Sequence, residues 1–247
     1  MRPDAITESS PLLTARIAGA LWLIVIVASV ATIGTRPLDW RADPGALVAA
    51  ATGAASAIRF TFALHFFGKI CYIGVTILLY ELLKPVNRSV ALFSAFCGLA
   101  GLLSGTSAFN DFTGLALLEE SQRAAAPLAN QLQTTAQSII MTHSLGSGGE
   151  DVFFGGQIAA LGYLIMRSRL IPRVIGALLL LGGAGFLIVS FTSFLSPTLD
   201  ERLAPLILPI AILGEGSATL WLLIKGVNVE QWRAVVSRRA AIDRAAG

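Results

Sequence analysis

The chain has 247 residues and a formal net charge of +3, from 18 Lys and Arg against 15 Asp and Glu. Hydrophobic residues make up 55% and charged residues 13%, well below the roughly 25% charged residues of soluble domains. This composition excludes a soluble globular domain and predicts a polytopic membrane protein. The basic residues form short clusters between apolar runs and lack the continuous, aromatic-rich patch of a nucleic-acid-binding surface, so we expect no nucleic-acid partner.

Six apolar stretches approach or exceed the roughly 20 helical residues that cross a hydrocarbon core about 30 Å thick. They predict an all-α bundle of six transmembrane helices at residues 14–34, 60–83, 88–110, 137–166, 171–195 and 204–225. The first stretch resembles a signal peptide at its flank, but it is longer than a usual signal-peptide core, which favours an uncleaved helix. The fourth is the least apolar, because Gly-Ser-Gly-Gly-Glu-Asp interrupts it at 146–151.

Basic residues predict the orientation of these helices. Twelve of the 18 Lys and Arg residues fall on one side of the predicted membrane: Arg2, Arg16, Lys84, Arg88, Arg167, Arg169, Arg173, Lys225, Arg233, Arg238, Arg239 and Arg244. Because cytoplasmic loops carry an excess of Lys and Arg, both termini are expected in the cytoplasm. The chain then divides into a cytoplasmic segment (1–13), a six-helix domain (14–228) and a basic cytoplasmic tail (229–247).

The connections and the glycine spacing add two expectations. The Ala-rich connections at 35–59 and 111–136 predict short helices on the outer surface. Glycines at 98, 101 and 105, and again at 176, 182, 183 and 185, predict close helix packing. Packing within one chain is the favoured interpretation, and a homodimer face is the alternative.

Charged and polar residues inside the spans mark the candidate site, because an unpaired charge in hydrocarbon costs several kcal/mol or more. His65 and Lys69 are four residues apart, and therefore share one helical face, which Tyr72 continues. A second stripe on the fourth span carries His143, Glu150, Phe154 and Gln157, with Asp151 beside it. Glu215 lies about halfway along the sixth span, and Asp111 follows the third.

These residues are predicted to lie at similar depths in the membrane. They therefore predict one polar pocket that opens toward the outer face. One lysine cannot neutralise three carboxylates, so we expect a carboxyl group that stays protonated or shares a proton near neutrality. The candidate catalytic residues are Glu150, Asp151, Glu215 and His143, and the candidate ligand-binding residues are His65, Lys69, Tyr72, Asp111, Phe154 and Gln157. The structural alternative is that Glu215 pairs with Lys69 to lock two helices, while the histidines pack.

Metal and cofactor chemistry find little support in the sequence. His143 and Glu150 are seven residues apart, and no compact spacing of His and acidic ligands accompanies them. Cys71 and Cys97 both fall within apolar spans, where neither a disulfide nor a metal site is expected. We therefore expect no metal and no cofactor.

Several stretches resemble a bacterial family of six-span membrane proteins, catalogued as domain of unknown function 4386. They are TARIAGALWLIVIVAS from residue 14, LLYELLKPVNRSVALFSAF from residue 78, FFGGQIAALGYLIMRSRLIPRVIGALLLLGG from residue 153 and LGEGSATLWLLIKGVN from residue 213. The resemblance implies a six-helix integral membrane fold in the bacterial inner (cytoplasmic) membrane, and it supplies no activity. His143, Phe154 and Glu215 match the family pattern, whereas the Glu150-Asp151 pair and His65 with Lys69 are unusual in it.

Three functions fit these residues. The first is an intramembrane enzyme in which a carboxylic acid transfers a proton to an isoprenoid or another lipophilic substrate, with aromatic residues stabilising positive charge. The second is a regulatory or structural membrane partner without chemistry. The third is a small proton-coupled transporter, which suits interrupted helices and charges near the bilayer midplane. The expected partners are the lipid bilayer, a lipophilic small molecule and, as an alternative, a second copy of the chain.

Overall fold

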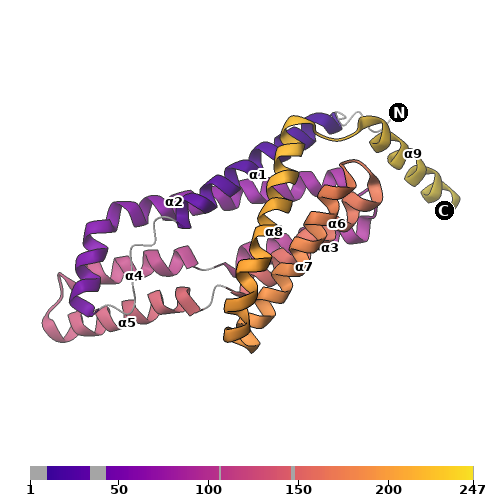
Figure 1. Cartoon of the computed structure of the whole chain (residues 1–247). Helices are drawn as coiled ribbons and strands as arrows, with labels where there is room; N and C mark the ends of the chain where they lie inside the picture. The colour runs from indigo at the N-terminus through magenta and orange to yellow at the C-terminus, as the bar shows by residue number, and fades with distance from the viewer. Residues whose placement is uncertain (1–9, 34–42, 106, 146–147, 247) are drawn as a thin grey trace.

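The computed structural model describes residues 10–33, 43–105, 107–145 and 148–246, and every regular element among them is an α-helix. This confirms the predicted all-α class. In chain order (Figure 1) the helices are α1 (Pro11–Ile33), α2 (Pro44–Leu83), α3 (Arg88–Ser104), α4 (Ser107–Ser121), α5 (Ala126–Leu145), α6 (Gly148–Ser168), α7 (Arg173–Leu195), α8 (Pro197–Ile224) and α9 (Val229–Ala246).

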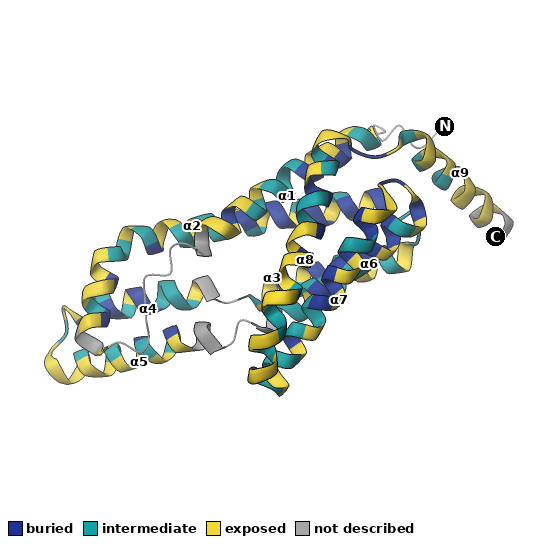
Figure 2. Cartoon of the chain, in the orientation of Figure 1, coloured by how far each residue is buried: buried dark blue, intermediate teal, exposed yellow. Residues whose placement is uncertain are grey.

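Six of these helices form a closed ring. In order around the ring, α1 packs on α2, α2 on α3, α3 on α6, α6 on α7, α7 on α8, and α8 returns to α1. Figure 2 shows that buried residues concentrate where these helices meet, whereas α9 is mostly exposed. The interior of the ring therefore receives side chains from helices that are far apart in the sequence.

One end of the ring carries most of its basic residues. The turns after α2, α6 and α8 lie there, close to the start of α1. The backbone N–H of Asn228 donates to the carbonyl of Leu170 at 3.0 Å, and the Trp232 indole donates to the carbonyl of Leu82 at 3.1 Å. We call this the basic end, and it carries Arg16, Lys84, Arg88, Arg167, Arg169, Arg173 and Lys225.

Glycines allow the ring helices to touch through their backbones. A Cβ atom on Gly183 of α7 would lie 2.3 Å from the Ala159 nitrogen of α6, and one on Gly162 would lie 2.4 Å from the Leu180 nitrogen. Gly19 of α1 meets Leu223 of α8 in the same way, at 2.5 Å. These contacts within one chain confirm the intrachain interpretation of glycine packing in the fifth span.

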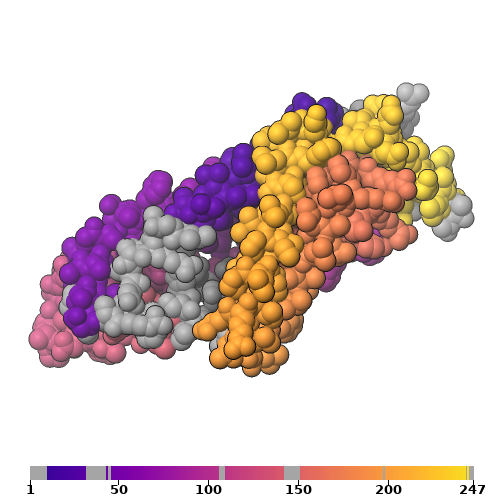
Figure 3. Space-filling model, viewed as in Figure 1, coloured from indigo at the N-terminus to yellow at the C-terminus, as the bar shows by residue number. Residues whose placement is uncertain are grey.

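The second structural unit is a three-helix extension, formed by residues 44–59 of α2 with α4 and α5. Helix α2 has 40 residues, and at 1.5 Å per residue it is about 60 Å long, roughly twice the thickness of a hydrocarbon core. Its first half packs with α4 and α5 around a separate core: Leu47, Ala51, Ile58, Leu115, Leu118, Ala136 and Ile140. Figure 3 shows the resulting elongated molecule, with the extension on one side of the ring.

Two sequence-based expectations about the connections are wrong. Residues 44–59 are not a separate surface helix, because after Pro44 at the helix start an Ala-rich run without further proline continues directly into the second span. The predicted span at 137–166 is two helices. Its first part belongs to α5, whose alternating glutamine and apolar residues suit a helix half-buried on α4, and only α6 enters the ring.

Membrane-spanning character is clear from the length and hydropathy of the helices. Five stretches are long and apolar enough to cross a bilayer: Pro11–Ala31, Ala46–Leu83, Arg88–Ser121 (which contains α3 and α4 and runs over residue 106, outside the described residues), Arg173–Leu195 and Thr198–Ile224. Helix α6 is not among them, because its first turns carry Glu150, Asp151 and Gln157. The protein is thus an all-α membrane protein in which the most polar ring helix is flanked by apolar ones.

Candidate functional site

The centre of the ring holds a hydrogen bond between α2 and α6. The Tyr72 hydroxyl donates to Oε1 of Gln157 at 2.5 Å, and both side chains are buried. The Tyr72 ring also meets Phe154 edge to face, with ring centroids 5.4 Å apart. Tyr72, Phe154 and Gln157, which the sequence analysis assigned to ligand binding, are therefore brought together by the fold.

Helix α3 provides the space for Gln157 and Phe154. A Cβ on Gly98 would lie 2.5 Å from the Gln157 amide, and one on Gly101 would lie 3.1 Å from the Phe154 ring. Ser94 donates from the same helix to the backbone carbonyl of Gln157 at 3.2 Å. The glycines of the third span therefore accommodate Gln157 and Phe154 of α6 within one chain.

Glu215 approaches the same place from α8. Its carboxyl group has the Trp22 side chain of α1 as a hydrogen-bond partner and lies close enough to Asp151 of α6 for electrostatic interaction. It also interacts electrostatically with Tyr72. Glu215, Asp151 and Tyr72 come from three different helices, and Trp22 from a fourth. We call these four residues with Gln157 the inner cluster.

Buried hydroxyl groups extend the inner cluster toward the basic end. Thr76 follows Tyr72 by four residues, and Thr219 follows Glu215 by four, so each hydroxyl continues its helix face. Among the described residues, the hydroxyls of Thr76 and Thr219, and that of Ser190 near the opposite end of α7, are buried without a hydrogen-bond partner. Unsatisfied polar groups are costly in an apolar bundle, so these three positions are suited to a polar guest.

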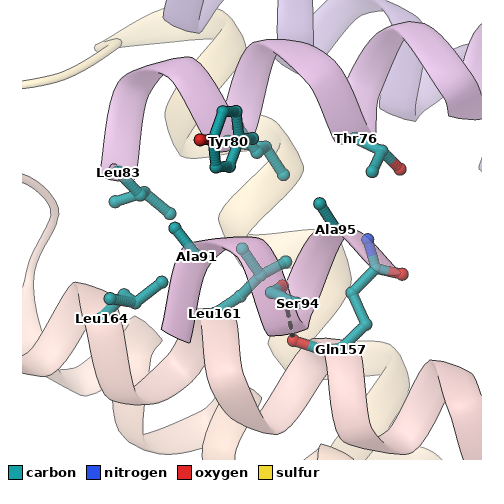
Figure 4. A pocket seen from close by; sticks show the side chains of 10 residues that line it. Thr76, Tyr80, Leu83, Ala91, Ser94, Ala95, Gln157, Leu161 and Leu164 are labelled. Carbon is teal, nitrogen blue, oxygen red and sulfur yellow. Dashed lines mark hydrogen bonds between the residues drawn. The ribbon is translucent and has the colours of Figure 1, made fainter. Parts of the chain in front are cut away.

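A small cavity adjoins Thr76 (Figure 4). It measures about 10 Å³, lies between α2, α3 and α6, and is lined by Thr76, Ser94 and Gln157 together with apolar side chains. This volume corresponds to about one water molecule, and the three polar residues are the kind of lining that such a water requires. A larger molecule would have to bind elsewhere in the ring.

Lys69 reaches a different partner. Its ammonium group donates to the carbonyls of Leu102 at 2.9 Å and Gly105 at 2.6 Å, at the carboxyl end of α3. A cation is favourable there, because the last carbonyls of a helix lack intrahelical donors and carry partial negative charge. Among the ion pairs of the described residues, none joins Lys69 to Glu215.

His65 and Asp111 lie farther toward the extension. His65 is partly buried one turn before Lys69, with its ring edge to face with Phe66. Asp111 is partly buried on α4, next to Phe112, which stacks on Phe62 of α2 with a centroid distance of 4.4 Å. His65, Lys69 and Asp111 thus belong to the junction of ring and extension rather than to the inner cluster.

Two candidate catalytic side chains lie outside the described residues. The backbone of His143 belongs to α5 and that of Glu150 to the first turn of α6, but the structure does not describe their side chains. Among the residues that it does describe, no group of three or more His, Cys, Asp and Glu side chains is placed to hold a metal ion.

Trp22 is the inner-cluster residue that the sequence analysis missed. Tryptophan in membrane helices is enriched at the two interfaces, whereas Trp22 lies in the middle of α1 and is 2% exposed. A tryptophan in the middle of a predicted span could therefore have indicated, from the sequence, that its indole N–H has a hydrogen-bond partner inside the bundle. Its partner, Glu215, could not be read from the sequence.

Comparison with known proteins gives one family match. The model of a family described as domain of unknown function (DUF4386) matches residues 17–226. No curated protein and no solved structure matches the chain. The family match begins within α1 and ends at the turn after α8, so that it includes all or part of every ring helix, and the chain therefore belongs to the DUF4386 family.

Proposed function

We propose that the protein binds a lipophilic molecule beside Glu215 and exchanges a proton with it, as an acid/base enzyme of the bacterial inner membrane. The observation that carries this proposal is the meeting of two carboxyl groups inside a ring of apolar helices. Glu215 and Asp151 interact electrostatically, and Trp22 and Tyr72 surround Glu215. Two neighbouring carboxyl groups can share one proton, and the protonated group is then available as a general acid.

The approach to Glu215 is apolar. Figure 1 shows α1 and α8 diverging with distance from their contact near the basic end. In the part of α8 that precedes Glu215, Leu206 is 70%, Ile212 69% and Leu213 63% exposed. Apolar side chains exposed on a membrane helix face lipid, so a lipophilic molecule moving through the hydrocarbon can approach the carboxyl group from this side.

The proposed chemistry suits an isoprenoid alkene. A proton moves from the Glu215 carboxyl group to one alkene carbon and leaves a carbocation at the other. Loss of a neighbouring C–H proton to the carboxylate then forms the shifted double bond and restores the acid, with no redox change. The aromatic rings of Tyr72 and Phe154, which pack edge to face beside the inner cluster, would stabilise the cation, since aromatic rings attract positive charge.

The proposed topology places all six ring helices across the bilayer, including α6, with both termini in the cytoplasm. The basic end supports this orientation, because Lys and Arg are enriched on the cytoplasmic side of membrane proteins. The three-helix extension then stands on the outer side, and Glu215 lies within the membrane. In this topology Gln157 of α6 is buried inside the ring rather than exposed to lipid.

Deuterium incorporation tests the chemistry without knowledge of the product. The protein, reconstituted in nanodiscs, is incubated in D₂O with a panel of polyprenyl alcohols, which are then analysed by mass spectrometry. We expect incorporation into at least one alcohol above that with empty nanodiscs. Glu215→Gln keeps an oxygen that accepts from Trp22, and it should lower the rate by about 10²-fold or more.

Glu201→Gln is the matched control, because Glu201 is an exposed acid on the same helix, and it should keep the wild-type rate. Wild-type incorporation by folded Glu215→Gln would refute the proposal, as would a panel with no incorporation at all. If proteoliposomes show solute flux that follows a pH gradient and requires Glu215, without incorporation, the inner cluster serves proton-coupled transport instead.

A further inference from the structure

The basic end contains a groove that the proposed chemistry does not use. It lies between the turn that joins α6 to α7 and the turn that joins α8 to α9, and its volume is about 650 Å³. Arg169 and Arg173 line one side, and Lys225 and Trp221 line the other. This volume is far larger than the space for one water molecule beside Thr76.

The floor of the groove is held by backbone interactions. Asn228 donates from its backbone to the Leu170 carbonyl, and Leu170 and Val227 are both buried. Each turn contains one residue in the left-handed region, Arg169 with φ 59° and Gly226 with φ 70°. A non-glycine residue in this region costs about 1 kcal/mol or more and persists where its surroundings hold it. The groove is therefore a fixed feature of the ring.

The groove carries three positive charges that the described chain does not neutralise. Arg169, Arg173 and Lys225 are exposed, and none of them makes an ion pair with a described residue. Other cations of the chain do have such partners: Lys84 pairs with Glu81, and Arg59 pairs with Glu119. Three unneutralised cations around one groove favour an anionic ligand.

Apolar surface adjoins these cations. Val174 follows Arg173 in α7 and is 71% exposed, and Ile224 precedes Lys225 in α8 and is 61% exposed. Trp221, a residue type enriched at membrane interfaces, forms part of the groove wall. The groove thus joins a cationic surface to a lipid-facing one, which matches a phosphate headgroup with acyl chains better than it matches a free phosphate.

We infer that this groove binds the headgroup of an anionic phospholipid, with its phosphate between Arg169, Arg173 and Lys225 and its acyl chains along Val174 and Ile224. Basic pockets between membrane helices are known to bind anionic headgroups. This inference does not depend on the chemistry at Glu215, which lies within the ring on α8.

Native mass spectrometry of the detergent-solubilised full chain tests the inference, with phosphatidylglycerol and phosphatidylcholine as probes. The wild type should retain phosphatidylglycerol in preference to phosphatidylcholine. The double variant Arg173→Gln/Lys225→Gln should lose on the order of 10- to 30-fold of this preference, given the contribution of each basic residue near a membrane surface. Arg173→Lys keeps the charge and should keep most of the preference.

The matched control is Arg233→Gln/Arg238→Gln, which removes two exposed charges of α9 outside the groove. It should bind phosphatidylglycerol as the wild type does. If both double variants lose the preference for phosphatidylglycerol equally, the preference depends only on net charge and the groove is not a binding site. An unchanged preference in Arg173→Gln/Lys225→Gln would also contradict the proposed site. If millimolar inorganic phosphate displaces phosphatidylglycerol, the groove binds a soluble anion, and the proposal of a lipid ligand is wrong.

Discussion

The Tyr72 hydroxyl donates to Gln157 across the ring, and the Gln157 amide rests against the bare backbone of Gly98. This relationship joins α2, α3 and α6 at one point. It places a hydrogen-bonded phenol next to the acids of the inner cluster, since Tyr72 interacts electrostatically with Glu215. The same contact therefore belongs both to the packing of the ring and to the candidate site.

The first prediction concerns that hydrogen bond. Tyr72→Phe leaves the buried Gln157 oxygen without its donor and should lower the free energy of unfolding by about 1–3 kcal/mol. Thermal unfolding in detergent micelles measures the change. Adding Gln157→Leu should recover much of the loss, because replacing both partners by apolar groups removes the unsatisfied atom.

Tyr163→Phe is the control for that experiment. Its hydroxyl lies on the exposed side of α6 and accepts from Arg167 at 3.0 Å, so its removal should change stability by less than about 0.5 kcal/mol. If Tyr72→Phe is as mild as Tyr163→Phe, the hydrogen bond between Tyr72 and Gln157 does not stabilise the ring.

The second prediction concerns the contact between α6 and α7. Gly183→Ala would put a Cβ 2.3 Å from the Ala159 nitrogen, where only backbone movement can make room. We expect destabilisation of about 1–3 kcal/mol, the usual cost of overpacking. Gly53→Ala in α2 is the opposite case, because nothing lies within 4 Å of its Cβ; it should stabilise the helix by about 0.5–1 kcal/mol. The same direction of change in both variants would contradict the structure of this contact.

The third prediction separates the core of the extension from its surface. Leu118 is fully buried in the extension core, so Leu118→Ala should cost about 2–5 kcal/mol and speed hydrogen exchange in α4 and α5. The ion pair between Arg59 and Glu119 is largely exposed, and Glu119→Gln should cost no more than about 1 kcal/mol. If Leu118→Ala also speeds exchange in α7, the extension and the ring are not independent units.

The fourth prediction concerns orientation. In a background in which Cys71 and Cys97, the two cysteines of the chain, are replaced by alanine, a cysteine is introduced by Glu201→Cys or by Arg238→Cys. Under the proposed topology, a membrane-impermeant maleimide added to intact cells should label Glu201→Cys, near the outer end of α8, and leave Arg238→Cys on α9 unlabelled until the cells are lysed. The reverse pattern would invert the topology.

The sequence by itself determined the class of the protein and much of the ring. Hydropathy and helix length are local properties, so the all-α membrane fold and most ring helices could be predicted without tertiary contacts. Helical periodicity also placed Tyr72 near Thr76, and Phe154 near Gln157, on shared faces.

Only the tertiary structure decided which faces meet. It joined Trp22 to Glu215, turned Lys69 toward the end of α3, and separated α5 from α6. These outcomes depend on the packing of helices that lie far apart in the chain, and neither hydropathy nor periodicity contains that information. Apolar composition alone does not determine whether a helix packs in the ring or in the extension. Close contacts between glycines and neighbouring helices help to determine which helices pack together.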